Sequence, residues 1–297
     1  MATQAPTVVP TGQGGALSGR LRSRSGQQNL EVWAIRIILI ILTVITLFPT
    51  LYIVTYSLKK GQALYSPTLF PTEYTFANYT KLLGGQFPLW VRNSLFLGVA
   101  SGLISVFMAA MGGYAFSRFR FPGRKYGILL LLLVQMLPTT GAIVALFRMF
   151  QVFGLLNKLS GLVILFGIGG GALSVWLMKN FMDSIPQELD QAAYIDGASH
   201  WTTFWRILFP LIQPMLVAQF IFGFIGVYNE YITTTIFLSD PKLYPLGVGV
   251  RTFSTQYNTN WTVFCAAAVL GSLPILIIFF LAQRFLVEGL TKGALKG

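Results

Sequence analysis

The chain has 297 residues, of which 54% are hydrophobic and only 10% are charged, and its formal net charge is +12. A soluble domain typically carries roughly 25% charged residues, so this composition excludes an ordinary water-soluble fold and favours a membrane protein. The basic residues are spread between apolar blocks, which excludes the basic stripe of a nucleic-acid-binding protein and is typical of loops beside membrane spans. One cysteine and one histidine exclude an intrachain disulfide and a multi-histidine metal site.

Residues 1–30 differ in composition from the rest of the chain. The stretch "TGQGGALSGRLRSRSGQQ" is rich in Gly, Ser and Gln and has few residues able to bury. We predict a disordered cytoplasmic tail. The first apolar run begins too late for a cleaved signal peptide, and no small-residue cleavage site follows it. Residues 31–297 are predicted to form the transmembrane domain.

Long apolar runs predict the membrane spans. A helix that crosses the hydrocarbon needs about 20 mostly apolar residues. Backbone groups inside lipid must be satisfied within the segment, so runs of this length indicate helices. The fold class is therefore predicted as all-α, a polytopic membrane protein with six transmembrane helices. The runs are Ile37–Tyr56, Ser94–Phe116, Gly127–Phe147, Leu159–Met178, Ile207–Leu238 and Phe264–Gln283.

The distribution of basic residues predicts the orientation. The short link between spans two and three, "SRFRFPGRKY", carries four basic residues and no acid. The N-terminal tail and the C-terminal end are also basic, and six spans place all three on one side. The positive-inside rule makes that side cytoplasmic, so both termini are expected on the cytoplasmic side of the cell membrane.

The polar segment between spans four and five, residues 184–208, predicts a cytoplasmic helix–turn–helix. Ser184 with Gln187 fits a capping box, and Pro186 suits the first helical turn. Glu188 and Asp190 then lie near the positive end of the helix dipole. One apolar face is expected from Leu189, Ala192 and Ala193.

The second half of this hairpin is predicted to be a separate short helix. Gly197 is placed to end the first helix in a left-handed conformation, Ser199 can cap the second, and Pro210 marks the passage into span five. An alternative is an interfacial helix anchored by tryptophans on lipid headgroups. Such helices favour Lys and Arg, whereas the first helix is acidic, which favours a protein groove as the partner. The apolar stripe of the second helix comprises Trp201, Phe204, Trp205 and Leu208.

The stretch "QAAYIDGASHWTTFWRILFP" resembles the EAA loop of ABC importer permeases: Glu-Ala-Ala, two residues, Asp-Gly-Ala, then Phe and Pro downstream. Gln191 stands where the family usually has Glu. The resemblance runs over residues 30–297 and is closest to the smaller permease subunits of maltose-type carbohydrate importers, as "LYPLGVGVRTFSTQY" and "AQRFLVEGLTKGALKG" also indicate. The matching residues are Ala192, Ala193, Asp196, Gly197, Ala198, Phe204 and Pro210.

This resemblance implies that the hairpin is a coupling helix docked on a cytoplasmic ATPase. It implies four partners besides the lipid bilayer: a larger homologous permease, two ATP-binding-cassette ATPase subunits and an extracytoplasmic sugar-binding protein. The chain would form half of a pathway for maltose, maltodextrin or a related oligosaccharide such as trehalose, in the cell inner membrane. The ATPase-coupling residues would be Gln191, Ala192, Ala193, Asp196, Gly197, Ala198, Trp201 and Phe204.

No G-x-x-x-x-G-K-[ST] phosphate loop occurs in the sequence. ATP and Mg²⁺ are therefore expected on the partner ATPase, with no cofactor, catalytic residue or enzymatic activity on this chain. A secondary transporter or channel subunit is the alternative, and it would place ion-coupling charges at mid-membrane in broken helices. Only Glu230 fits that description. A membrane enzyme needs convergent acid–base groups, which the sequence does not offer.

Glu230 is the one acid within a long apolar run and is therefore a candidate for the pathway. Tyr228, Asn229 and Tyr231 beside it could hydrogen-bond to sugar or stack on it. The alternatives are a polar helix–helix contact or a position that meets outside water. Pro138, Pro274 and the glycines of "GIGGGA" are interpreted as kink and packing residues.

The outer segment Asp240–Trp261 is, on its residues alone, an exposed connection. By resemblance it corresponds to the loop that reaches into the mouth of a sugar-binding protein. The candidates for that contact are Gly247, Gly249, Thr252 and Gln256.

The predicted orientation is tested by cysteine labelling. A cysteine introduced near Lys242 is expected to react with an impermeant thiol reagent added outside the cell, because the segment after span five faces outward. A cysteine near Arg120 is expected to stay unlabelled, because positive loops are retained inside. The reverse labelling pattern would overturn the orientation.

Overall fold

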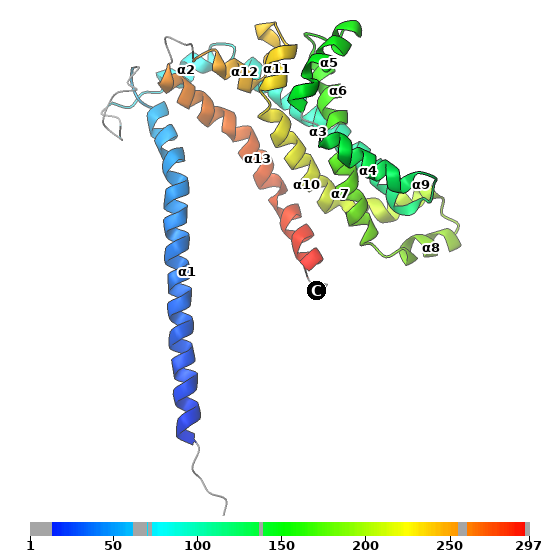
Figure 1. Cartoon of the computed structure of the whole chain (residues 1–297). Coiled ribbons are helices and arrows are strands. Elements are labelled where there is room, and N and C mark those ends of the chain that lie inside the picture. Colours follow the sequence, from blue (N-terminus) through cyan, green and yellow to red (C-terminus); the bar gives the residue numbers. More distant parts are fainter. Residues whose placement is uncertain (1–13, 62–69, 71–72, 137–138, 255–259, 295–297) are drawn as a thin grey trace, which may run out of the picture. The chain divides into compact units, whose positions relative to one another are not determined.

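The computed structural model describes residues 14–61, 70, 73–136, 139–254 and 260–294. These residues are helical apart from turns, loops and one isolated bridge between Lys59 and Tyr74. The all-α prediction is confirmed. The chain divides into two compact units, residues 1–54 and 55–297, and most of the first is the helix α1 (Figure 1).

The helix α1 covers Gly14–Ser57, and its stretch Val32–Ser57 is long and apolar enough to cross a membrane. Thr43 Oγ1 donates to the Leu39 carbonyl at 2.7 Å and Thr46 Oγ1 donates to the Leu42 carbonyl at 2.8 Å, so these two hydroxyls need no other partner in lipid. The helix begins inside the segment that we predicted to be disordered. Leu, Arg and Gln in residues 21–30 are good helix formers, whereas residues 1–13 lie outside the described part.

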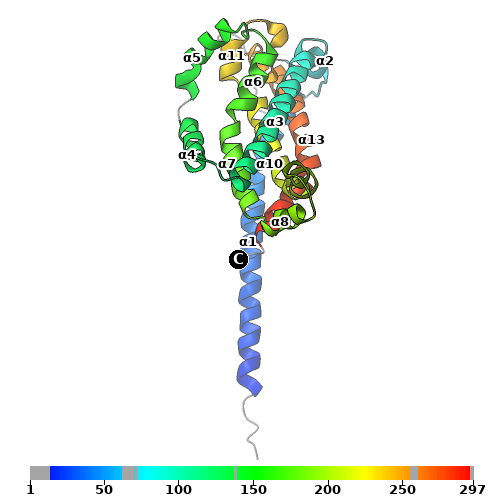
Figure 2. The same ribbon diagram turned by 90° about the vertical axis from the view of Figure 1, so that its right-hand side faces the viewer.

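The second unit is organised around α3 (Phe87–Arg118), which packs along α6, α7 and α10 (Figures 1 and 2). Glycines let the backbones approach closely. A Cβ on Gly98 would lie 2.6 Å from the Phe224 ring, and one on Gly113 would lie 2.5 Å from Met178. The other elements are α2 (Ala77–Leu83), α4 (Arg124–Gln135), α5 (Thr139–Val152), α6 (Leu159–Gly169), α7 (Gly171–Asp183), α8 (Glu188–Ile195), α9 (His200–Thr203), the π-helix η1 (Phe204–Leu208), α10 (Phe209–Tyr228), α11 (Ile232–Phe237), the 3₁₀-helix η2 (Pro241–Leu243), α12 (Leu246–Arg251) and α13 (Trp261–Ala294).

Five helices in the described residues are long and apolar enough to span a membrane. The predicted third span is not one continuous helix, because α4 and α5 are separate elements, and Pro138 between them lies outside the described residues. The count of six spans therefore stays a prediction. The long run Ile207–Leu238 is not a single helix either: α10 ends at Tyr228, and α11 starts at Ile232.

The segment after α11 is fastened to the bundle by α3. The Asn93 amide donates to the Lys242 and Tyr244 carbonyls at 2.8 and 3.1 Å. The Ser94 hydroxyl accepts the Leu246 amide at 2.7 Å. The described part of this segment is only partly an exposed connection, because Leu246, Val248 and Gly249 are buried and polar side chains of α3 satisfy its backbone groups. Residues 255–259 lie outside the described part. It lies at the end of the second unit opposite to α8 (Figures 1 and 2).

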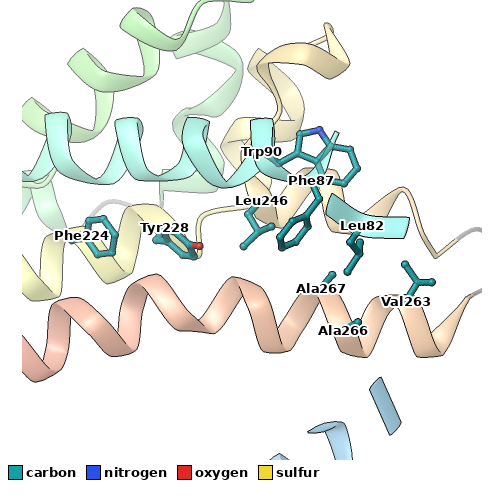
Figure 3. Close-up of a cluster of buried hydrophobic side chains, with 9 residues drawn as sticks. All are labelled: Leu82, Phe87, Trp90, Phe224, Tyr228, Leu246, Val263, Ala266 and Ala267. Atoms are coloured by element: carbon teal, nitrogen blue, oxygen red, sulfur yellow. The ribbon is translucent and has the colours of Figure 1, made fainter. Parts of the chain in front are cut away.

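A cluster of buried apolar side chains holds this end together. Figure 3 shows side chains from α2, α3, α10, α12 and α13 that face one another. Gly249 of α12 lies directly against Trp90, so that a Cβ there would be 2.1 Å from the indole Cδ2. The nine buried members are Leu82, Phe87, Trp90, Phe224, Tyr228, Leu246, Val263, Ala266 and Ala267.

We expect Gly249→Ala to lower the free energy of unfolding by about 1–3 kcal/mol, because the methyl group overpacks the Trp90 contact. Thermal unfolding of the purified protein measures the change. Gly247→Ala is the matched control on the same helix, since a Cβ there meets only the Glu230 carbonyl oxygen at 3.6 Å, an ordinary contact. Equal unfolding temperatures for the two variants would contradict this packing.

Candidate functional site

The predicted hairpin starts later than its sequence suggested. α8 begins at Glu188, and its N-cap Gln187 makes no side-chain cap hydrogen bond. Ser184 donates instead to the Phe181 carbonyl at 2.7 Å. The predicted capping box was wrong because Ser184 bonds back to the end of α7 rather than forward to α8. The acids Glu188 and Asp190 do lie in the first turn of α8.

The turn that ends α8 has the predicted geometry. Gly197 has φ +81°, the left-handed conformation that favours glycine. The Gly197 amide donates to the Tyr194 carbonyl at 3.1 Å, and the Ala198 amide donates to the Ala193 carbonyl at 2.9 Å. This pair of bonds is the Schellman motif. Ser199 then caps the next helix, since its Oγ accepts the Thr202 amide at 3.2 Å.

The second arm is not a separate short helix. One continuous helix runs over His200–Tyr228, through a π-helical turn at Phe204–Leu208. The Phe209 amide donates to the Phe204 carbonyl, five residues back. Pro210 has no amide hydrogen to donate, and a π turn accommodates this extra residue without breaking the helix. Pro210 therefore does not mark a boundary, and the second arm is the first part of the fifth predicted span.

The apolar stripe of the second arm is divided between two surroundings. Phe204 and Leu208 are fully buried and pack with Met178 and Ile212, whereas Trp201 is 62% exposed. Ile195 at the end of α8 is 86% exposed. A large apolar group at a surface indicates an interaction site.

The eight coupling candidates differ accordingly in what they can contact. Gln191, Ala192, Asp196, Gly197 and Trp201 are exposed, and Ala198 is half-buried. Ala193 and Phe204 are buried within the chain, at 6% and 0% exposure, so these two fix the arms rather than face a partner.

Arg118 belongs to this site, in addition to being one of the basic residues that predict the orientation. Its guanidinium Nε pairs with Asp190 Oδ2, and the two side chains are only 5% and 6% exposed. Nη1 donates to the Met182 carbonyl, and Nη2 donates to the Ile185 carbonyl, both at 3.0 Å. Burial raises the pKa of the Asp190 carboxyl above its usual value, and the positive charge of Arg118 opposes that rise.

A second polar contact joins α3 to the end of α7. The Ser117 hydroxyl donates to Asp183 Oδ1 at 2.7 Å. Lys179 pairs with Asp183 Oδ2 at 2.5 Å, one helical turn before it. Arg124 donates to the Ser117 carbonyl at 3.3 Å. The last turn of α3 is thus bonded both to the end of α7 and to α8.

A small pocket of about 160 Å³ lies beside these contacts, between α8 and the end of α3. On one side the Tyr194 hydroxyl is 2.8 Å from His200 Nδ1. The Tyr114 hydroxyl donates to the His200 carbonyl at 3.1 Å. His200 thus ties the start of the second arm to both α8 and α3.

The pathway candidates lie at the break between α10 and α11. Glu230 caps α11, because Oε1 accepts the Thr233 amide at 2.9 Å and Oε2 accepts the Thr234 amide at 3.0 Å. Tyr228 is 3% exposed, and its hydroxyl donates to the Gly271 carbonyl at 2.9 Å. Glu230 is therefore a helix cap in this structure, and Tyr228 is a core residue.

The other two pathway candidates, Asn229 and Tyr231, differ in exposure, since Tyr231 is half-buried like Glu230. Asn229 is exposed, and its amide donates to the Ile225 carbonyl at 3.0 Å. The Tyr231 ring lies 5.6 Å from the Arg251 guanidinium. A pocket of about 330 Å³ lies beside Tyr228, Asn229 and Arg251, between the end of α10, α12 and α13.

The candidates for contact with a sugar-binding protein are distributed unevenly. Gly249 is buried under Trp90, so it packs the chain rather than meeting a partner. Thr252 is exposed and donates to the Gly249 carbonyl at 2.7 Å. Gly247 is half-buried, and Gln256 lies outside the described residues. Within the described ranges, no group of three His, Cys, Asp or Glu residues is placed to hold a metal ion.

Comparison with known proteins identifies several relatives. The chain is 37% identical over 267 residues to the galactooligosaccharides transport system permease protein GanQ of Bacillus subtilis. The aligned residues cover 88% of this chain and 94% of that protein. It is 34% identical over 289 residues to the maltose/maltodextrin transport system permease protein MalG of Escherichia coli, and this alignment covers 91% of this chain and 97% of that protein.

A solved structure has the same fold. A chain from a bacterial ABC transporter involved in the import of the acidic polysaccharide alginate aligns with a TM-score of 0.77 at 22% identity, over 88% of this chain and 98% of that one. The family model described as "Binding-protein-dependent transport system inner membrane component" matches residues 102–292. Since that match covers more than half of the chain, the protein belongs to this family of ABC permeases and is a multi-pass membrane protein.

Proposed function

We propose that the chain is a permease subunit of an ABC importer and forms half of the membrane pathway for an oligosaccharide. The observation that carries the proposal is the hairpin. Its turn is fixed by a Schellman motif, and its outer surface presents exposed apolar side chains, Trp201 and Ile195 among them. A rigid element with an apolar outer face is suited to a groove on another protein.

The partner for this face is a cytoplasmic ATPase of the ATP-binding-cassette type. ATP-driven closure of two such subunits would displace the hairpin and, with it, the helices to which it is joined. The second arm continues without interruption into α10, and the first arm follows the end of α7. Displacement of the hairpin therefore tilts both spans. The energy comes from the partner, which binds ATP and Mg²⁺, and this chain has no enzymatic role.

The substrate is an oligosaccharide such as maltose, maltodextrin or trehalose, delivered by an extracytoplasmic binding protein. The two relatives above are named for the transport of galactooligosaccharides and of maltose and maltodextrin, which supports a sugar as the substrate. Calorimetric titration of the cognate binding protein with a panel of these sugars identifies the substrate. Binding of amino acids and of no sugar would overturn the sugar class.

A secondary transporter remains the alternative function, and the surroundings of Glu230 argue against it. An ion-coupling carboxylate must be free to bind its ion at mid-membrane. Both oxygens of Glu230 are already occupied by the amides of Thr233 and Thr234. The same contacts place the negative charge at the N-terminus of α11, where the helix dipole stabilises it.

We expect the chain to purify as a heterodimer with a larger related permease, together with two ATPase subunits. One chain with the six predicted spans would make half a pathway, and the exposed apolar face of the hairpin needs a partner. Affinity purification from mild detergent, followed by mass determination of the intact complex, measures the composition. Isolation of a transport-competent homodimer of this chain would refute the predicted assembly.

Gly197→Val is expected to impair ATP hydrolysis and sugar uptake together while leaving membrane insertion intact. A β-branched residue at φ +81° costs about 1–3 kcal/mol of local strain, which tilts the two arms apart. In the described part of the chain no heavy atom lies within 4 Å of a Cβ at this position, so the backbone alone causes the effect. Both rates are measured in proteoliposomes.

Gly197→Asn is the matched control for this variant. Asparagine tolerates the left-handed conformation better than other non-glycine residues, so most of the activity should remain. Normal transport by Gly197→Val with the ATPase still bound would show that the hairpin is not the coupling element, and the interfacial-helix alternative would then hold.

A further inference from the structure

We propose that Arg118 is a positioning residue that locks the hairpin to α3, so that movement of the hairpin is transmitted to the second span as well as to the fourth and fifth. This inference rests on the proposed function, since it concerns how force from the ATPase spreads through this chain. The sequence alone suggests a simpler route, in which only the two spans that flank the hairpin move.

The contacts of one guanidinium group carry the argument. Arg118 ends α3, and its three nitrogens reach three different places: Nε pairs with Asp190 of α8, Nη1 bonds the carbonyl of Met182 in α7, and Nη2 bonds that of Ile185 in the connecting loop. The planar guanidinium can make the ion pair and the two hydrogen bonds at once, because its nitrogens point in fixed, diverging directions. It therefore joins α3, α7 and α8 at one point.

Burial makes this junction rigid. The Arg118 and Asp190 side chains are 5% and 6% exposed, so water cannot readily replace either partner. Separation of two charges that remain buried is strongly unfavourable. The hydrogen bond from Ser117 to Asp183 fixes the same turn of α3 to the end of α7 a second time. The start of the hairpin cannot move without carrying the end of α3 with it.

The packing of α3 lets a displacement at this junction affect helices beyond the hairpin. α3 contacts α6, α7, α10 and α12 along its length, and at its far end Asn93 and Ser94 hold the segment after α11. A displacement of its last turn is thus passed to the opposite end of the second unit by a single helix. The route joins the hairpin to the segment proposed to meet the sugar-binding protein.

The test distinguishes a positioning role of Arg118 from a mere contribution to fold stability, because it removes both charges of the pair together. Arg118→Met alone would leave Asp190 buried without its cation, which destabilises the fold for a trivial reason. Arg118→Met with Asp190→Leu replaces the pair by apolar groups of similar size, which buried ion pairs often tolerate. This double variant loses the bonds to the Met182 and Ile185 carbonyls but leaves no unpaired charge. Lys125→Met is the control, because it removes an exposed positive charge from the start of the next helix, α4.

Two quantities are measured on the full complex in proteoliposomes with its binding protein. The first is sugar imported per ATP hydrolysed. The second is the distance between spin labels at Glu188 and Arg120, both exposed, placed in a chain in which Cys265 is replaced by serine. In the otherwise native chain this distance should be the same with and without ATP, because α8 and the end of α3 move together.

In the double variant the distance should change on addition of ATP, and import per ATP should fall about tenfold, within the range typical of coupling between two sites. Lys125→Met should match the native chain in both measurements. Arg118→Lys keeps the charge but not the forked geometry, so an intermediate loss is expected, and it supplies the test if the double variant does not assemble.

The role of Arg118 would be overturned if the double variant imported as much sugar per ATP as the native chain and its label distance did not change with ATP. If the double variant does not assemble, a native import ratio in Arg118→Lys would overturn it. Failure of the proposed function has a different signature: the native chain itself would not retain an ATPase during purification.

Discussion

The need to satisfy every backbone amide and carbonyl inside lipid governs how this chain can bend. Continuous helices meet that need by themselves, so each interruption requires a specific substitute. Where α6 gives way to α7 at Gly170, the Leu173 amide donates to the Gln135 side chain of α4 at 2.7 Å. Where α10 ends, the Glu230 carboxylate accepts two amides of α11. Polar residues in these apolar runs thus serve the backbone.

The same constraint explains why the hairpin has two unlike arms. The second arm cannot pause at Pro210 without leaving carbonyl groups unpaired close to the membrane, and the π turn at Phe204–Leu208 keeps the helix intact. The first arm lies beyond the apolar spans and can end in a tight turn at Gly197. One arm is therefore a rigid extension of a span, whereas the other is a short helix held by side chains.

Much of this arrangement follows from the sequence, because local rules decide it. Apolar run length predicts most of the spans, and the left-handed glycine and the Ser199 cap follow from the preferences of single residues. Fold class and family were also predictable. The predictions about Ser184 and Pro210 were wrong because each assigned a residue its commonest local role, whereas Ser184 bonds back to α7 and a π turn carries the helix past Pro210. The run through Glu230 was predicted to be one helix from its length, whereas Glu230 caps a second helix there.

The role of Arg118 could not be predicted, because its partners are 64 to 72 residues away in the chain. Arg118 lies in a cluster of four basic residues, and the positive-inside rule already accounts for a positive charge there. The signal that could have found it is Asp190, an acid three residues before Ala193 on the face of α8 that is buried. An acid on that face is buried when the helix packs, and a buried carboxylate requires a cation.

The pairing of Asp190 also bears on Gln191, which replaces the glutamate common in this motif. With Asp190 turned inward and Gln191 neutral, the exposed surface of α8 retains few charges, and Leu189 and Ile195 are 42% and 86% exposed on it. Trp201 adds a large apolar group from the second arm. The contact with an ATPase groove would then depend mainly on apolar burial, which has no preferred direction. Such a contact allows the hairpin to pivot in its groove, provided that its own two arms are held rigidly together. The buried junction at Arg118 and the Schellman turn at Gly197 supply that rigidity from opposite ends of α8.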